Sequence, residues 1–199
     1  MQIDKWDRET TGFSFVVGET SEALQIAKVP KKQIRMDSSK IKALLEKHGG
    51  MTAEIIKEIP ELLENPIVVI DSKKDDNSRI VMGDLYDANG KMVTVVLLLT
   101  PTSRKGNVLD IIKISSAEGR GHIQSLFYKD DKSPVTVRYV DKKRIHSWLY
   151  ANRLQLPLRN LGLDSNDKVS QPEPKVNRKF SRKDASGLTQ EIARIQREG

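Results

Sequence analysis

Residues 66 to 99 read Pro66-Ile-Val-Val-Ile70, then Arg79-Ile-Val-Met-Gly-Asp-Leu-Tyr86, then Met92-Val-Thr-Val-Val-Leu-Leu-Leu99. The three runs are rich in β-branched and aliphatic residues, which favour strands. In the third run apolar side chains occupy both alternating faces, as is typical of a strand that is covered on both sides. We therefore predict that residues 92–99 form the central strand of a β-sheet.

The segment Asp87-Ala-Asn-Gly90 separates the second run from the third. An Asn-Gly pair tolerates positive φ at both central positions of a type I′ turn, a common connection between antiparallel strands. The sequence therefore predicts a tight hairpin with a type I′ turn.

Composition limits the class of protein. The chain has 199 residues, of which 37% are apolar, enough for one domain with additional length. It has no cysteine and only three widely spaced histidines, which excludes disulfides, thiolate chemistry and the usual zinc-ligand spacing. No apolar stretch has the length of a membrane span, and the N-terminus lacks the apolar core of a signal peptide. We expect a cytoplasmic protein that needs no cofactor and contacts no membrane.

The net charge of +7 favours a polyanionic partner, because lysines and arginines that neutralise phosphates gain from counterion release. Part of this charge lies near the C-terminus. Residues 159–199 hold nine Lys/Arg and six Asp/Glu, a net +3, which leaves +4 for residues 1–158. The predicted folded part is therefore only modestly basic.

Periodicity and capping residues predict the other elements. We expect strands at residues 13–17, 33–37, 108–116 and 135–140. We expect helices at residues 22–28, 37–47, 52–65, 122–129 and 142–152. Pro60 should kink the third of these helices or divide it in two. The predicted fold class is α+β, with N-terminal helices packed on a small, mainly antiparallel sheet and a closing C-terminal helix.

The composition changes after the last predicted helix. From Asp164 the chain is polar and contains Ser-Gln-Pro-Glu-Pro, followed by the basic run Asn177-Arg-Lys-Phe-Ser-Arg-Lys183. Such a composition offers too few apolar residues to pack. We predict a domain at residues 1–158 and a basic linker or tail at residues 159–199.

Several motifs over residues 12–158 are similar to a known group of proteins. They are Ile41…Lys47-His48, Ile59-Pro-Glu-Leu-Leu-Glu-Asn-Pro-Ile67, Ser78-Arg79, Tyr86-Asp-Ala-Asn-Gly-Lys91, Leu109-Asp-Ile-Ile-Lys-Ile114 and Trp148-Leu…Asn152-Arg-Leu-Gln-Leu-Pro157. The chain resembles the Barnase, EndoU, colicin and RelE-like nuclease domains found in large polyvalent proteins of phages and mobile elements. The phage MuF C-terminal domain is a close second likeness, within the same broad group.

The resemblance implies a ribonuclease-like toxin or effector domain that acts in the cytoplasm of a bacterial host cell. It also implies that other modules of a polyprotein are partners. Two positions depart from the group, which usually carries a tyrosine where Glu118 stands and an acidic residue near His122. The resemblance therefore assigns no role to these two residues.

Cleavage of RNA without a metal needs a base, an acid and cations around the charged phosphorane. His48 matches the group's histidine, and histidine is suited to proton transfer near neutrality. Arg79 matches the Ser-Arg motif and can hold a phosphate by two hydrogen bonds. Ser116 ends a predicted strand. We predict that His48, Arg79 and Ser116 converge as catalytic residues, although a helix-end histidine, a rim arginine and a strand-end serine are ordinary structural features.

Three further residues are candidates for substrate binding: Ser72, Lys113 and Arg120. Ser72 follows a predicted strand, and Lys113 is expected on the face opposite Ser116. Arg120 lies in Gly119-Arg-Gly121, which lacks the spacing of a phosphate loop. In the group that the chain resembles, the position of Asp84 is usually held by glutamate. Asp84 is expected to face away from Arg79.

Other catalytic classes are disfavoured, because the chain lacks Gly-x-Ser-x-Gly, His-Glu-x-x-His and a carboxylate cluster for two metals. Two hypotheses remain. The first is a metal-independent endoribonuclease whose partner is RNA. The second is an inactive nucleic-acid-binding or protein-binding module on the same fold. The sequence does not indicate the oligomeric state.

Overall fold

The computed structural model describes residues 2–6, 11–130 and 133–163, so the predicted tail from residue 164 onward lies outside the described residues. Within the described residues the chain forms seven strands: β1 (Ser14–Glu19), β2 (Gln33–Asp37), β3 (Val68–Asp71), β4 (Ser78–Met82), β5 (Met92–Leu98), β6 (Ile112–Arg120) and β7 (Val137–Val140). The helices and 3₁₀ turns are η1 (Ile3–Lys5), α1 (Glu22–Ile26), α2 (Ser38–Lys47), α3 (Ala53–Glu64), η2 (Gln124–Phe127), α4 (Ile145–Ala151) and η3 (Leu158–Leu161).

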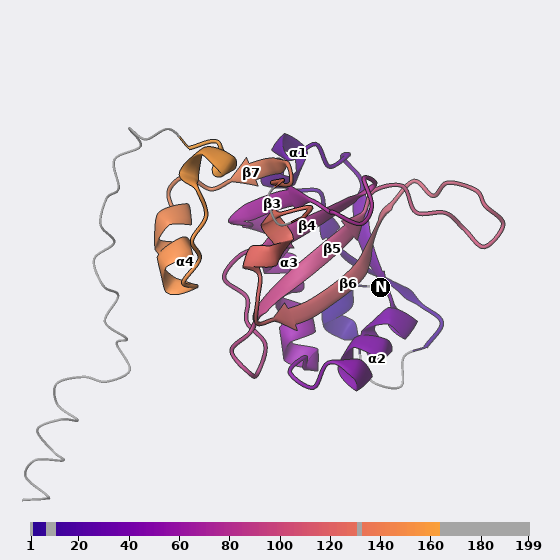
Figure 1. Ribbon diagram of the computed structural model, residues 1–199. Coiled ribbons are helices and arrows are strands. Elements are labelled where there is room, and N and C mark those ends of the chain that lie inside the picture. Colours follow the sequence, from indigo (N-terminus) through magenta and orange to yellow (C-terminus); the bar gives the residue numbers. More distant parts are fainter. Residues whose placement is uncertain (1, 7–10, 131–132, 164–199) are drawn as a thin grey trace, which may run out of the picture. The chain divides into compact units, whose positions relative to one another are not determined.

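The strands form one sheet in the order β1-β2-β6-β5-β4-β3-β7. All neighbouring pairs are antiparallel except β2 and β6, which are parallel. The run of residues 92–98 is the fourth of the seven strands, which confirms its predicted central place. The α+β fold class is confirmed as well, and Figure 1 shows β5 and β6 running side by side across the sheet.

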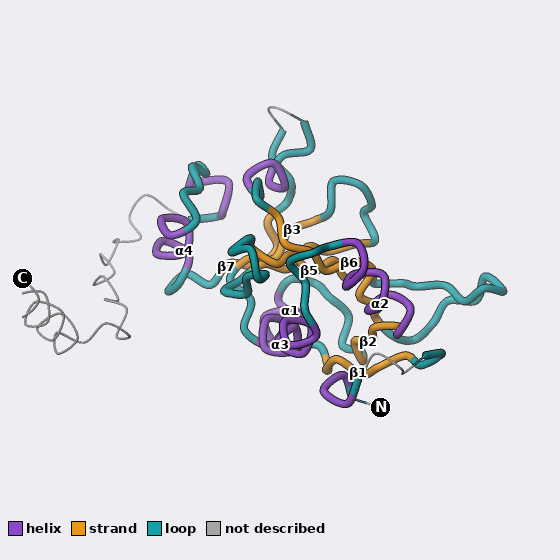
Figure 2. Tube along the Cα trace, turned by 90° about the horizontal axis from the view of Figure 1, so that it is seen from below, coloured by secondary structure: helices purple, strands orange, loops and turns teal. Residues whose placement is uncertain are grey.

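Two of the helices begin at side-chain caps. The Ser21 hydroxyl accepts the N–H of Leu24 at the start of α1, and the Thr52 hydroxyl accepts the N–H of Ile55 at the start of α3. Helix α3 continues through Pro60 as one element, so the alternative of two short helices is wrong. Figure 2 shows α1 and α3 side by side, on one side of the sheet.

The sheet buries apolar residues on both faces. We call the face of Val95 the first face and the face of Met92 the second face. On the first face Val93, Val95 and Leu97 pack in one cluster with residues of α1, α2 and α3. On the second face Met92 belongs to another cluster, with residues of β3, β4, η2, α4 and η3. The Trp148 indole N–H donates to the Gly83 carbonyl at 3.3 Å, which fixes α4 against the strand region.

A β-bulge in β6 changes which side chains reach the second face. Val96 pairs with Ser116, but the next residue, Leu97, pairs with Ile114, so Ser115 is the extra residue. Ser116 therefore faces the same side as Val96, whereas Ile114 lies in the first-face cluster. The prediction that Lys113 lies on the face opposite Ser116 is wrong for this reason, because Lys113 pairs with Leu98 on the face of Val96. The strand also runs from Ile112 to Arg120, so its predicted bounds of 108–116 are wrong by four residues at each end.

The hairpin between β4 and β5 is confirmed, but its turn is not type I′. The Gly90 N–H donates to the Asp87 carbonyl at 2.9 Å, and Gly90 has φ +71°, whereas Asn89 has no positive φ. One left-handed residue after a turn is the pattern of a type I turn with a glycine bulge. The Asp87 carboxylate stabilises this form by accepting the N–H groups of Asn89 and Lys91.

Candidate functional site

The polar residues in the second half of β6 lie on the second face and are half-buried. Ser116, Glu118 and Arg120 alternate along this strand. In the neighbouring strand Thr94 pairs with Glu118, so its side chain points to the same face. Strand β6 pairs with β2 only through Ile112 and Lys113, which leaves this half of β6 next to the C-terminal end of α2.

His48 reaches this part of the sheet from the end of α2. The backbone N–H of His48 donates to the Leu44 carbonyl at 3.0 Å, and the His48 carbonyl accepts the N–H of Met51 at 2.8 Å. The His48 backbone is therefore held on both sides. The imidazole Nε2 lies 3.5 Å from Oε2 of Glu118. This spacing is longer than an ordinary hydrogen bond but places the two groups in direct electrostatic contact.

The other oxygen of Glu118, Oε1, accepts a hydrogen bond from the Arg120 guanidinium. The Arg120 Nε donates to the Thr94 hydroxyl at 3.2 Å, and that hydroxyl donates to the Glu118 carbonyl at 3.4 Å. Thr94 is almost fully buried, with 1% of its surface exposed. A buried hydroxyl therefore fixes the arginine, and the arginine fixes the carboxylate.

We call His48, Thr94, Glu118 and Arg120 the His48 cluster. The side chains of His48, Glu118 and Arg120 are 34%, 23% and 37% exposed, so a ligand can reach all three. The cluster offers an imidazole and a guanidinium that each contact a different oxygen of the same carboxylate. These groups can accept a proton, donate a proton and stabilise an oxyanion.

Two glycines make room for the Asp87 carboxylate beside the His48 cluster. A Cβ at Gly50 would lie 2.2 Å from Asp87 Oδ2, and a Cβ at Gly119 would lie 2.1 Å from the same oxygen. Gly50 follows His48 by two residues, and Gly119 is adjacent to Glu118. Asp87 therefore connects the backbone segments that carry the imidazole and the carboxylate.

Arg79 does not join the His48 cluster. It pairs with Leu97 in the sheet, which places it on the first face, and only 8% of it is exposed. Its NH1 group donates to the carbonyls of Asp76 and Ser78, and its Nε lies 3.2 Å from Asp71 Oδ1 without the alignment of a hydrogen bond. The predicted convergence of Arg79 with His48 and Ser116 is therefore not found.

Asp71 is the centre of this partly buried ion group. Arg138 donates to both carboxylate oxygens, at 2.8 and 2.7 Å. Burial raises the pKa of Asp71, but the hydrogen bonds from Arg138 and the charge of Arg79 outweigh it and hold the pKa below its usual value. The same contact raises the pKa of Arg138. These contacts of Asp71 with Arg79 and Arg138 link strand β3 to β4 and to β7.

The remaining sequence candidates lie in different places. Ser116 shares the face and the strand of Glu118. Lys113 also lies on the second face, because of the bulge, and donates to Asp37 at 2.8 Å. Burial raises the pKa of Asp37, but the hydrogen bond from Lys113, the Ser14 hydroxyl and the charges of Lys113 and Arg35 together outweigh it and lower the pKa. Ser72 accepts the N–H of Lys74 in the turn after β3, so it is a turn residue.

A groove of about 540 Å³ begins at Arg120. Its lining residues come from the start of β5, the segment after β6 and the end of α4: Gly90, Met92, Arg120, Gly121, His122, Ile123, Gln124, Ala151, Asn152, Arg153 and Leu154. A second, smaller pocket of about 180 Å³ includes Asp84 and is lined by Glu58, Glu61, Leu62, Asn65, Asp84, Leu85 and Arg144. His122 thus lines the larger groove, and Asp84 lies in an acidic pocket.

Sequence reasoning missed the contact of Glu118 with His48. The signal that could have found it is the alternation of Ser116, Glu118 and Arg120, which continues the strand pattern beyond residue 116. Thr94 gave no signal, because a lone threonine in an apolar strand is ordinary.

Among the described residues no group of three or more His, Asp or Glu is placed to hold a metal ion. Within the same residues no helix has the length and apolarity needed to cross a bilayer.

The fold and the His48 cluster define an α+β domain with a compact polar site on one face of its sheet. The model of the phage MuF C-terminal domain family matches residues 40–147, which include His48, Glu118 and Arg120. The chain belongs to the phage MuF C-terminal domain family. No curated protein and no solved structure matches it.

Proposed function

We propose that this domain is a metal-independent endoribonuclease whose catalytic residues are His48, Glu118 and Arg120. The observation that carries the proposal is the contact of His48 with one oxygen of Glu118 while Arg120 holds the other. An imidazole and a carboxylate side by side can serve as acid and base in one reaction. The phage family and the net positive charge agree with a nucleic-acid substrate.

The reaction is an internal transfer of the phosphoryl group. Glu118 takes the proton of the ribose 2′-hydroxyl, and the 2′-oxygen forms a bond to phosphorus. The bond from phosphorus to the 5′-oxygen breaks, and His48 in its protonated form gives a proton to that oxygen. The products are a 2′,3′-cyclic phosphate and a 5′-hydroxyl, and no co-reactant is needed.

Arg120 stabilises the charge that develops on the phosphorane oxygens. Its Nε is held by Thr94 and one NH2 group by Glu118, so the guanidinium is oriented before substrate binds. Charge stabilisation by a pre-oriented donor is commonly worth about 10² to 10³ in rate. Ser116, on the same strand face, is placed next to the site but has no assigned step.

The test is cleavage of single-stranded RNA by the full chain with EDTA present. His48→Ala and Glu118→Gln should each reduce the rate by about 10² to 10⁴, the usual contribution of a general acid or base. The matched control is His146→Ala, because His146 lies on α4 and contributes nothing to the His48 cluster. Equal rates for the wild type and His48→Ala would remove His48 from the mechanism.

The inactive binding module gives a different result. In that case the wild type cuts no RNA but binds it, and binding weakens steeply with added salt. Mass spectrometry of the products is a further check, because the proposed reaction must leave a cyclic phosphate.

A further inference from the structure

The groove that begins at Arg120 has features of a binding site for a charged, extended ligand. Its volume of about 540 Å³ is within the usual range of ligand pockets. Arg120 belongs both to the groove lining and to the His48 cluster, so the two sites are continuous. A ligand bound in the groove therefore extends directly from the proposed reaction centre.

The charge of the groove favours a phosphate-bearing ligand. Its lining residues include two arginines, Arg120 and Arg153, and one histidine, His122, but no acidic residue. The smaller pocket provides the contrast, because three of its seven lining residues are Asp or Glu. A polyanion is attracted by the first surface and repelled by the second.

The two walls of the groove also supply groups suited to bases and sugars. Asn152 lines the groove and exchanges hydrogen bonds with the Tyr86 hydroxyl, at 3.2 and 3.1 Å. Tyr86 does not itself line the groove, but it is bonded to a lining residue and is 37% exposed, and an accessible aromatic side chain can stack on a base. Gln124, another lining residue, donates to the Gln155 carbonyl at 3.4 Å, which connects the segment after β6 to the segment after α4.

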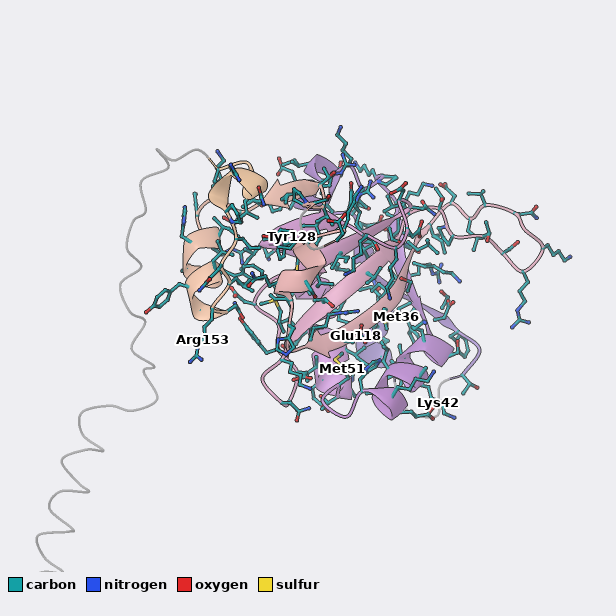
Figure 3. All side chains as sticks on the ribbon, in the orientation of Figure 1. Met36, Lys42, Met51, Glu118, Tyr128 and Arg153 are labelled. Carbon is teal, nitrogen blue, oxygen red and sulfur yellow. The ribbon has the colours of Figure 1, made fainter. Side chains whose placement is uncertain are left out.

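Arg153 is held in an unusual backbone conformation at the groove. It has φ +53°, one of two positive-φ non-glycine residues among the described residues. Its N–H donates to the Tyr150 carbonyl at 3.1 Å, which ends α4. A left-handed conformation is costly for a residue with a Cβ, and Figure 3 shows Arg153 at the end of α4.

We propose that this groove binds the part of a single-stranded RNA that lies on one side of the cleaved phosphate. Arg120 contacts the cleaved phosphate, Arg153 and His122 contact the next phosphate along the strand, and Tyr86 stacks on a base. The inference rests on the proposed function, because it assumes that the His48 cluster holds the reacting phosphate. It adds the substrate class, a single strand that extends beyond two nucleotides, because a base pair would keep the base from the tyrosine.

The experiment measures binding apart from cleavage. The full chain is titrated by fluorescence anisotropy with an RNA octamer and with a dinucleotide, both made uncleavable by 2′-O-methyl groups, at several salt concentrations. Arg153→Ala should weaken octamer binding about tenfold. It should also reduce the slope of the logarithm of the binding constant against the logarithm of the salt concentration by about 0.7, which corresponds to the loss of one phosphate contact to a single strand. Dinucleotide binding should be unchanged. Arg153→Glu should weaken octamer binding further.

The matched control is Arg104→Ala, because Arg104 is an exposed arginine of the loop between β5 and β6 and does not line the groove. Thermal melting verifies that each variant folds. Unchanged octamer binding in both Arg153 variants would overturn the groove proposal, even if the wild type cuts RNA. If the wild type cuts no RNA but the Arg153 variants selectively weaken octamer binding, the groove proposal is supported and the nuclease proposal is rejected. Absence of RNA binding by the wild type rejects both.

Discussion

Gly119→Ala is predicted to destabilise the domain by about 3 kcal/mol, because the new methyl group collides with Asp87. It would lie 2.1 Å from Oδ2, 2.6 Å from Cγ and 3.0 Å from Cβ of that residue. An ordinary contact needs about 3.5 Å, so the carboxylate must move by roughly 1.4 Å. Overpacking of this kind costs about 1 to 3 kcal/mol.

The displacement also breaks hydrogen bonds. Asp87 Oδ1 accepts the N–H groups of Asn89 and Lys91 at 2.9 and 2.8 Å, and the neighbouring Ala88 N–H donates to the Gly50 carbonyl. Each bond to a charged acceptor contributes about 1.5 to 3 kcal/mol, and moving the carboxylate loses part of this. The lower and upper bounds of the prediction are therefore about 2 and 4 kcal/mol.

Urea unfolding of the full chain measures the effect, with Gly121→Ala as the matched control. A Cβ at Gly121 meets nothing within 4 Å, so this variant should stay within about 0.5 kcal/mol of wild type or gain slightly. In an Asp87→Ala background the cost of Gly119→Ala should fall below about 1 kcal/mol, since the colliding carboxylate is absent. An equal cost in both backgrounds would refute the steric argument.

Two further predictions concern the ion group around Asp71. Because the pKa of Asp71 is lowered in the folded state, its contribution to stability is present above the unfolded value of about 3.9 and is lost as the pH falls through the lower folded value. The difference in unfolding free energy between wild type and Asp71→Asn should therefore shrink on acidification from about pH 5 to pH 2, and a difference that grows instead would contradict the assigned sign. Arg79→Met should cost about 2 kcal/mol in urea unfolding, because it leaves buried carbonyls and part of the Asp71 charge without a partner, yet RNA cleavage by the folded variant should be unchanged. A selective loss of cleavage with normal stability would return Arg79 to the catalytic residues.

The fold was predictable because its main signals are local and repeated. The apolar runs around Val68, Val81 and Val95 identify three adjacent strands. The one-residue bulge at Ser115 was not predictable, because no sequence pattern distinguishes it from continued alternation. The type of the turn at residues 87–90 was predicted wrongly for a related reason. Its Asn-Gly pair suits a type I′ turn, but the Asp87 carboxylate favours a different one.

The candidate site depended on these same details. His48 was identifiable from its residue type. Its partner Glu118 could be identified only by knowing which face of the sheet the β6 side chains occupy after the bulge. Arg79 looked suitable as a phosphate ligand, but sequence alone does not reveal that Asp71 lies opposite it in β3. Charged residues in neighbouring strands can neutralise each other, and that pairing depends on register.

The spacing within the His48 cluster also indicates which group moves when substrate binds. A phosphate that lies between an acid and a base cannot fit into the 3.5 Å that separates His48 Nε2 from Glu118 Oε2. Glu118 is held by Arg120, which is held in turn by the buried Thr94, so displacing the carboxylate breaks its hydrogen bond to an oriented guanidinium. The His48 backbone is fixed, but its imidazole needs only rotation about its side-chain bonds. In the proposed reaction the imidazole therefore turns away to admit the phosphate, while the carboxylate and the guanidinium keep their places.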